Sequence, residues 1–151
     1  MEFSWYLTGF VDGEGCFSVS FNLRSRLSTG IEVRPSFSIS QNKRNLDLIK
    51  QISDYFGCGG VRFDNKDQTY KYEVRSIDDL IKKIVPHFER YPLKTSKHKD
   101  FLIFKDICRL VHSSHHLSPK TLPVILEKAY QMNESGKRKY TKEFLLKQLT
   151  R

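Results

Sequence analysis

The sequence predicts an α+β domain in which helices cover one face of a four-stranded antiparallel sheet, in the order αββαββα with further helices at the C-terminal end. Apolar residues recur at helical spacing in several segments and alternate with polar residues in four others, and glycine or proline separates most of these segments. Because each strand keeps one apolar face for the helices, the opposite face is left for water or a ligand.

The first expected helix covers residues 4–11, where Ser4 can cap it, and it ends at the sequence Asp12-Gly13-Glu14-Gly15. After it the apolar period changes from helical to two, which is the period of a strand with one buried face. Turn-forming residues then separate the strands into two hairpins. The four expected strands cover 17–24, 31–40, 61–64 and 70–75.

The remaining helices are expected where apolar residues return to helical spacing. Pro86 should interrupt one of them, because proline lacks the backbone donor and clashes with the preceding turn. The expected ranges are 44–56, 76–85, 96–111, 119–131 and 141–149. We expect a single domain over residues 1–151, with a core at about 4–111 and a helical addition at about 119–151.

The net charge of the chain indicates which kind of partner it would bind. Lysine and arginine number 26 against 17 aspartates and glutamates, so the chain carries a formal charge of +9 and favours a polyanion. Nucleic acid is the first expectation. Binding to a membrane surface would require the cations to lie on one amphipathic helix, whereas here they are spread over strand-like and loop-like segments. No apolar run approaches the roughly 20 residues that span a bilayer, so no membrane partner is expected.

The cysteines bear on the compartment. Three widely spaced cysteines form no CxxC pair and no Cys/His set at zinc spacing, so we expect reduced thiols in an intracellular, reducing compartment. The first four residues show no feature of a secretion or organelle signal.

The polar sides of the expected strands carry short hydroxyls, an amide, arginines, a lysine and a few acids. Arginine and asparagine read base edges in the major groove of DNA, and lysine and arginine also hold phosphates. An ordinary solvated sheet face is an alternative of about equal weight, and the basic Lys137 and Lys139 either grip flanking phosphate or solubilise a loop. The strand residues are Ser18, Ser20, Asn22, Arg24, Arg26, Glu32, Arg34, Ser36, Ser38, Ser40, Arg62, Asp64, Lys71, Glu73 and Arg75.

Asp12 and Glu14 lie where the first helix ends, at the negative pole of its dipole. Two carboxylates are unfavourable there unless a cation compensates them. A divalent metal is one such cation, and it could activate water and stabilise a phosphodiester leaving oxygen. The alternative is that both are solvated turn residues.

The nine residues Leu7-Thr8-Gly9-Phe10-Val11-Asp12-Gly13-Glu14-Gly15 closely resemble the LAGLIDADG motif of homing endonucleases, with Thr8 for the usual alanine and Glu14 for the usual second aspartate. The resemblance extends over about residues 4–111. It includes a basic stretch at 93–101 that resembles the segment before the family's longer helix. It implies that the four strands form a DNA-binding saddle.

The resemblance also implies roles for individual residues. Glu14, with the adjacent Gly13, would hold the metal, and Asp12 would support the helix end and the neighbouring subunit. Gln41 matches a polar position near the attacking water. Lys97 matches the basic residue that stabilises the phosphate charge, with Lys94 as the alternative if the register slips by a few residues.

The sequence contains one such motif, so the resemblance implies a homodimer in which two motif helices pack side by side through Leu7, Gly9, Phe10, Asp12 and Gly13. The implied activity is intron homing by Mg²⁺-dependent cleavage of a long, near-palindromic duplex. Cleavage would occur across the minor groove and leave short 3′ overhangs. Mn²⁺ is the alternative metal, and Ca²⁺ one that can bind without supporting cleavage. The implied location is a mitochondrion or chloroplast, or the host nucleoid or nucleus.

Two other classes of function are open. One is an RNA-binding intron maturase, which an exposed basic surface away from the sheet would favour. The other is a catalytically silent DNA-binding module of the same fold, against which Glu14 argues. His112, His115 and His116 have no supporting acidic or cysteine ligand nearby and are expected to form a solvated loop.

Overall fold

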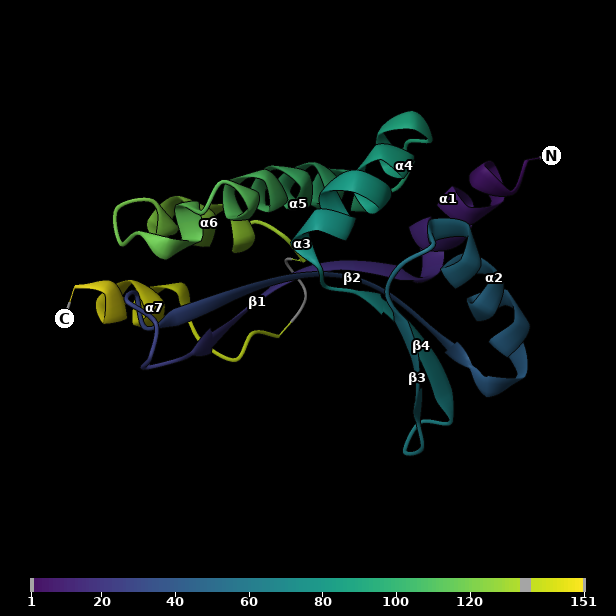
Figure 1. Ribbon diagram of the computed structural model, residues 1–151, viewed down its shortest axis with the longest axis horizontal. Helices are drawn as coiled ribbons and strands as arrows, with labels where there is room; N and C mark the ends of the chain where they lie inside the picture. Colours follow the sequence, from purple (N-terminus) through teal and green to yellow (C-terminus); the bar gives the residue numbers. More distant parts are fainter. Residues whose placement is uncertain (1, 134–136, 151) are drawn as a thin grey trace. The chain divides into compact units, whose positions relative to one another are not determined.

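The structure is a computed structural model that describes residues 2–133 and 137–150. Its elements follow the predicted order, and four strands form one antiparallel sheet with the spatial order β1-β2-β4-β3 (Figure 1). The predicted α+β fold is confirmed. The strands are β1 (Gly15–Leu23), β2 (Ile31–Asn42), β3 (Gly60–Asp64) and β4 (Thr69–Val74). The α-helices are α1 (Phe3–Glu14), α2 (Leu46–Phe56), α3 (Ile77–Asp79), α4 (Val85–Arg90), α5 (Lys97–His112), α6 (Leu122–Ala129) and α7 (Lys142–Leu149).

The chain divides into two compact units. The first unit comprises Met1–Phe17 and Ser36–His98, and the second comprises Ser18–Pro35 and Lys99–Arg151. The boundaries fall inside β1, inside β2 and near the start of α5. None of the helices in the described part of the chain has the length and apolarity needed to cross a membrane.

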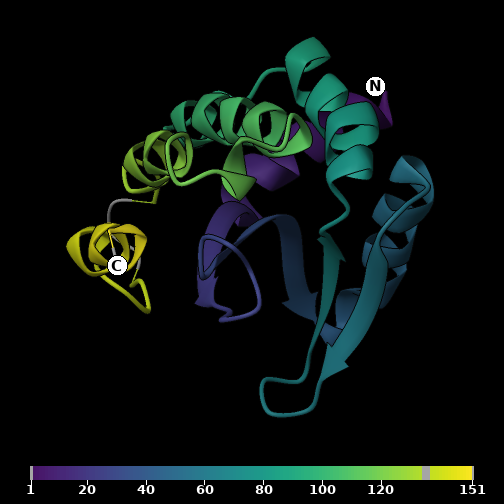
Figure 2. The ribbon, with the colours of Figure 1, turned by 60° about the vertical axis from the view of Figure 1, so that its left-hand side comes forward.

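The core of the first unit is aromatic. Phe37 of β2 lies 5.2 to 6.5 Å, between ring centroids, from four other rings. Helix α2 packs on β4 and β3 and runs beside them in Figure 2. Leu7 and Val11, on the inner side of α1, are also fully buried. The four rings around Phe37 are Phe17, Phe56, Tyr72 and Phe88.

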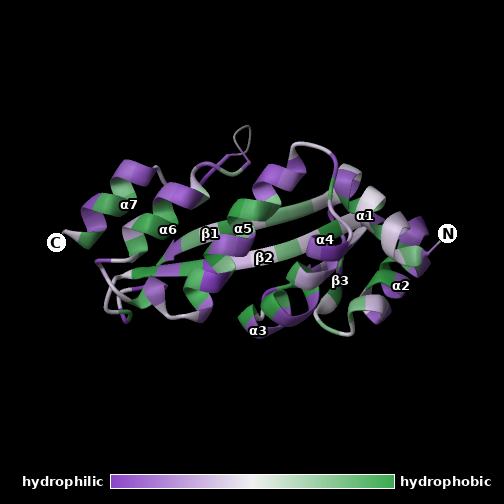
Figure 3. Cartoon of the chain, turned by 90° about the horizontal axis from the view of Figure 1, so that it is seen from above, coloured by the Kyte–Doolittle hydropathy of each residue, from purple (hydrophilic) through white to green (hydrophobic). Residues whose placement is uncertain are grey.

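The core of the second unit is formed by one side of each of its helices. Figure 3 shows hydrophilic and hydrophobic residues alternating in bands along α5, as expected for a helix with one buried side. Phe21 of β1 stacks on Tyr130, which follows α6, at 6.1 Å. The fully buried residues on the helices include Phe104, Ile107, Leu122, Ile125, Leu126 and Leu145.

The prediction that each strand keeps one apolar face for the helices is wrong in two places. Leu23 ends β1 and is exposed. Every residue of β3 is exposed, including the apolar Val61 and Phe63. The reason is that β3 is the edge strand of the sheet, and burial on its neighbour β4 is confined to Tyr72 and Val74.

The helices differ from prediction at their ends. Helix α1 continues through Glu14, and Ser4 lies inside the helix, where its hydroxyl bonds to Tyr55 instead of capping it. Pro86 does not interrupt the helical path, which runs from Ile77 to Arg90. A five-residue π-helical segment, η2 (Leu80–Ile84), precedes α4, so Pro86 lies in the first turn of α4, where proline is tolerated.

Candidate active site and nucleic-acid interface

The acidic pair lies in the last turn of α1. Asp12 is half-buried, whereas Gly13 and Glu14 are exposed. The last carbonyl groups of a helix have no intrahelical donor, so the carbonyls of this turn point toward whatever lies beyond the helix. The structure therefore places both carboxylates, Asp12 and Glu14, in the last turn of α1 at its negative end, as predicted.

Asp12 binds the segment that leads into α5. Its Oδ2 accepts a hydrogen bond from the Lys94 N–H at 2.8 Å, and its Oδ1 accepts from the Thr95 N–H at 3.1 Å and the Thr95 hydroxyl at 2.7 Å. Partial burial opposes ionisation of Asp12. The hydrogen bonds, together with the nearby Lys97 ammonium, outweigh it and keep the pKa of Asp12 below its ordinary value. Asp12 is thus an ionised anchor between α1 and the start of α5.

Lys97 compensates the helix end directly. Its Nζ donates to the Val11 carbonyl oxygen at 2.9 Å, which places an ammonium at the negative pole of α1. The cation that balances Asp12 is therefore supplied by the protein, whereas the sequence alone left a metal as one candidate. Lys94 is exposed, and only its backbone contacts Asp12.

Glu14 differs from Asp12 in that its carboxylate is exposed and has no hydrogen bond or ion pair with any residue in 2–133 or 137–150. Across these same residues no group of three or more His, Cys, Asp or Glu is arranged to hold a metal. Mg²⁺ commonly binds through one or two carboxylates and completes its shell with waters and substrate phosphates. The donor set of Glu14 and the Gly13 carbonyl fits such a partly open site and does not fit a closed structural one.

Gln41 lies near the end of β2, opposite Tyr70 of β4. Its Oε1 accepts a hydrogen bond from the Asn45 amide at 3.0 Å, which orients the Gln41 amide group. No hydrogen bond in the described ranges joins Gln41 to either acidic residue. Its role near an attacking water is untested and remains a prediction.

The outer side of α1 is open. A β-carbon added at Gly9 or Gly13 would meet nothing within 4 Å, so nothing in the chain itself requires glycine at these positions. Trp5 and Tyr6 expose 46% and 41% of their surface on the same helix, which sequence reasoning did not single out. The Leu7 side chain is fully buried in the chain's own core, so it offers no exposed surface on this side of α1.

Thr8, the residue that replaces the motif's usual alanine, joins a hydrogen-bond network in the first unit. Its hydroxyl donates to the Tyr91 carbonyl oxygen at 2.9 Å and lies 3.1 Å from Nε2 of His87. The other ring nitrogen of His87 lies 2.9 Å from the Tyr55 hydroxyl, which lies 2.8 Å from the Ser4 hydroxyl. Burial lowers the pKa of His87 to about 4. The motif helix is thereby tied to α2 and α4.

The polar side of the second unit's strands has Glu32 at its centre. Its Oε1 lies 3.1 Å from the Arg34 guanidinium and accepts from the Asn22 amide at 3.3 Å, and its Oε2 lies 3.8 Å from Arg24. Arg24 and Arg26 follow the end of β1, so they belong to the turn rather than the strand.

The first unit repeats this arrangement around Glu73 of β4. Arg62 of β3 lies 3.5 Å from the carboxylate, Lys71 lies 3.4 Å from it, and Arg75, just after β4, lies 3.1 Å from it. Each unit therefore presents a glutamate surrounded by cations on its polar strand face.

Some of the predicted DNA-facing residues fit an open face less well. Ser36 and Ser38 expose less than a tenth of their surface, so little of either side chain is open to a ligand. The Asp64 carboxylate accepts from the N–H groups of Lys66 and Asp67, so it stabilises the β3–β4 turn. The other members, all exposed or half-exposed, are Ser18, Ser20, Asn22, Arg24, Arg26, Glu32, Arg34, Ser40, Arg62, Lys71, Glu73 and Arg75.

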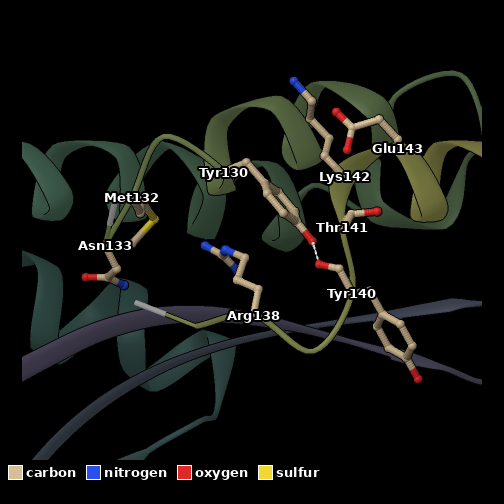
Figure 4. Close-up of a pocket in the computed structure, with 8 residues that line it drawn as sticks. All are labelled: Tyr130, Met132, Asn133, Arg138, Tyr140, Thr141, Lys142 and Glu143. Carbon is tan, nitrogen blue, oxygen red and sulfur yellow. Dashed lines mark hydrogen bonds between the residues drawn. The ribbon is translucent and has the colours of Figure 1, made fainter. Parts of the chain in front are cut away.

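The three residues of the basic segment at 137–139 have different roles. Arg138 donates to the Val19 carbonyl at 2.7 Å and the Ala129 carbonyl at 2.5 Å, and its guanidinium lies 4.5 Å from the Tyr130 ring centre (Figure 4). It lines a pocket beside α7 and is a structural residue. Lys137 is exposed, and the Lys139 ammonium lies 5.3 Å from the Tyr140 ring centre.

The fold and the acidic helix end define an α+β protein built on a LAGLIDADG motif helix. The chain belongs to the LAGLIDADG endonuclease family, whose model matches residues 7–108. Among curated relatives, a probable intron-encoded endonuclease of Neurospora crassa is 35% identical over 85% of this chain. The chain spans about a quarter of the length of the first curated relatives that it matches.

Two solved structures show how this fold occurs in relatives. The homing endonuclease I-TnaI is 37% identical and superposes with a TM-score of 0.83, covering 97% of this chain and 95% of that one. I-SmaMI, bound to uncleaved target DNA in the presence of calcium ions, is 32% identical with a TM-score of 0.84, covering 87% of this chain and 45% of that one.

Proposed function

We propose that this protein is a site-specific homing endonuclease that cuts duplex DNA by metal-dependent phosphodiester hydrolysis, with two copies forming the complete enzyme. The observation that carries the proposal is the exposed Glu14 carboxylate at the end of the motif helix, which has no partner among residues 2–133 and 137–150, next to an Asp12 that is already hydrogen-bonded. The Asp12 carboxylate stabilises the structure, and the Glu14 carboxylate is available to bind a metal.

The Glu14 carboxylate and the Gly13 carbonyl would hold the metal, with DNA phosphate oxygens and waters completing its shell. A bound Mg²⁺ lowers the pKa of its water and stabilises charge on the phosphate oxygens. Mn²⁺ is the expected substitute. The calcium present with uncleaved DNA in I-SmaMI supports Ca²⁺ as an ion that binds without promoting cleavage.

The surrounding residues would position and balance the reacting groups. An ammonium has three donors, and among the residues that the structure describes Lys97 uses one of them, on Val11, so the others could bind a phosphate that gains negative charge. Lys94 is the alternative source of that charge, since its side chain is exposed. Gln41, oriented by Asn45, would hydrogen-bond the attacking water.

The polar strand faces would bind the DNA. Their arginines and asparagine supply donors for base edges, and the formal charge of +9 draws the chain toward phosphates. Lys137 and Lys139 would contact flanking backbone. A duplex cut across the minor groove with short 3′ overhangs is the product expected for this family.

The second copy is supported by the open side of α1. Gly9 and Gly13 leave room for a close helix–helix approach, and the exposed Trp5 and Tyr6 supply apolar surface beside it. The interface would therefore comprise Gly9, Phe10, Asp12 and Gly13, with Trp5 and Tyr6 added and Leu7 removed. I-TnaI, of which this chain covers 95%, supports the single-motif arrangement.

The biological role would be intron homing, since relatives are named as intron-encoded endonucleases. An organelle, or the host nucleoid or nucleus, is the corresponding location.

A cleavage selection tests the proposal. A library of duplexes is incubated with the protein and Mg²⁺, and the cut ends are sequenced. We expect one family of near-palindromic sites cut by the wild type and none cut by Glu14→Gln, which keeps its affinity for the site because it removes charge at the metal but no contact to bases. Cleavage by Glu14→Gln at the wild-type rate would refute the proposal.

A further inference from the structure

The two glutamates on the polar strand faces are unusual members of a surface that would bind a polyanion. Glu73 exposes only 13% of its side chain, whereas Arg62 beside it exposes 62%. The register explains this difference, because Glu73 lies opposite Ser38 on β2 and opposite Gly60 on β3. Its two cross-strand neighbours are small, so the carboxylate lies low and the cations stand above it.

The carboxylate is also chemically occupied. Oε1 of Glu73 is shared by Arg62 and Arg75, and Oε2 faces the ammonium of Lys71. A group that already faces three cations is poorly placed to accept a further bond from a base. The cluster keeps a net charge of +2, so it still attracts DNA.

We propose that Glu73 is a positioning residue, which holds Arg62, Lys71 and Arg75 ready to read bases and weakens the attraction of this surface for DNA of any sequence, without touching DNA itself. The inference rests on the proposed function, because it takes the polar strand face as the DNA-binding surface. Long cationic side chains lose rotamer freedom on binding, and a partner that holds them beforehand reduces that loss. Specificity is a difference between affinities, so an acid that disfavours all DNA equally can sharpen it.

The second unit carries the same arrangement independently. Glu32 lies between Arg34 at 3.1 Å and Arg24 at 3.8 Å, and the Asn22 amide donates to it at 3.3 Å. The glutamate is again the less exposed partner in its ion pairs. We assign Glu32 the same role.

The test compares Glu73→Gln with Glu127→Gln, a control that removes the same charge from an ion pair between α6 and α7. Binding is measured in EDTA, so that DNA is not cut, to the selected target, its single-base variants and a random duplex of equal length over a series of salt concentrations. We expect Glu73→Gln to bind the random duplex about 3- to 10-fold more tightly, with a salt dependence steeper by about one unit. Discrimination against single-base variants should fall about fivefold or more at one pair of symmetric positions.

Two further variants keep the outcome decisive. Glu73→Asp retains the charge but shortens the reach, so it should keep the weak random binding and lose discrimination. Glu32→Gln should repeat the result of Glu73→Gln in the other unit. If Glu73→Gln has a lower melting temperature than the control Glu127→Gln, Glu32→Gln provides the test in its place.

Unchanged random binding and unchanged discrimination in Glu73→Gln and Glu32→Gln would overturn the inference. So would a loss of affinity confined to targets with one particular base, because that result would show a direct contact, for example to a cytosine amino group. If the wild type itself binds every duplex alike, the proposed function fails together with this inference. If the wild type discriminates between duplexes but neither glutamate variant changes its binding, this inference alone is refuted.

Discussion

Thr8 and His87 share a buried hydrogen bond, with 3.1 Å between Oγ1 and Nε2, although 79 residues separate them in the chain. The direction of the bond follows from its neighbours. The Thr8 hydroxyl gives its proton to the Tyr91 carbonyl, which can only accept, so Nε2 of His87 must be the donor. Nδ1 then accepts from Tyr55, and His87 is a neutral ring with both nitrogens satisfied.

The first prediction is that acid weakens the fold through His87. Its pKa is about 4 in the folded chain, below the ordinary value of 6.5, so the neutral ring stabilises the fold fully above pH 6.5. That contribution is lost as the pH falls from 6.5 toward 4, by up to about 3 kcal/mol. The measurement is the free energy of unfolding against pH for the wild type and His87→Gln. The wild-type curve should be steeper in this window, and parallel curves would contradict the prediction.

The second prediction concerns coupling between the same two residues. Thr8→Ala leaves the buried Nε2–H of His87 without an acceptor, which should cost about 1–3 kcal/mol of unfolding free energy. In His87→Leu that donor is absent, so adding Thr8→Ala there should cost less. A double-mutant cycle measured by denaturant unfolding checks this, and additive costs would show that the two side chains are not coupled.

The third prediction separates the two carboxylates. Asp12→Asn replaces an acceptor of three hydrogen bonds by an amide that presents donors to Lys94 and Thr95, so it should lose about 1–3 kcal/mol of stability. Glu14→Gln should change stability by less than about 0.5 kcal/mol, because the carboxylate has no partner in the described chain. Thermal or denaturant unfolding of both variants is the measurement. Equal losses would mean that the two acids have the same structural role.

The local patterns were sufficient for most of the fold. Alternation predicted β1 and β2 well because the apolar residues of each lie in the core. It failed at β3 because no pattern within Val61 to Phe63 reveals that this strand lies at an uncovered edge. The motif was found because its nine residues are contiguous. The partners of Asp12 were not found, because Lys94 and Thr95 are 82 and 83 residues away and their contribution is largely backbone N–H, which every residue carries.

The fourth prediction divides the basic segment at 137–139. Arg138→Ala removes two charged donors from backbone carbonyls and a cation–π contact, so it should destabilise the fold by about 2–3 kcal/mol. Lys137→Ala should leave stability unchanged and weaken binding to all duplexes, with a salt dependence shallower by about one unit. Unfolding and salt-dependent binding measured on both variants check this. A stable Arg138→Ala that loses only DNA affinity would reverse the assignment.

The fifth prediction uses the open side of α1. Within one chain, Gly9→Ala places its new methyl group in open space and replaces the poorest non-proline helix former, so it should stabilise the isolated fold by up to about 1 kcal/mol. If two motif helices approach closely at Gly9, the same methyl group must keep them apart, and dimer affinity and cleavage should both fall. Sedimentation over a range of protein concentrations, unfolding under monomeric conditions and cleavage of the selected target measure the three effects. Lys50→Ala, at an exposed position of α2 outside the proposed interface, is the control for a substitution to alanine on a helix surface. A Gly9→Ala variant that is more stable and dimerises and cleaves as well as the wild type would show that the pairing surface lies elsewhere, because the chain alone offers this methyl group no obstacle.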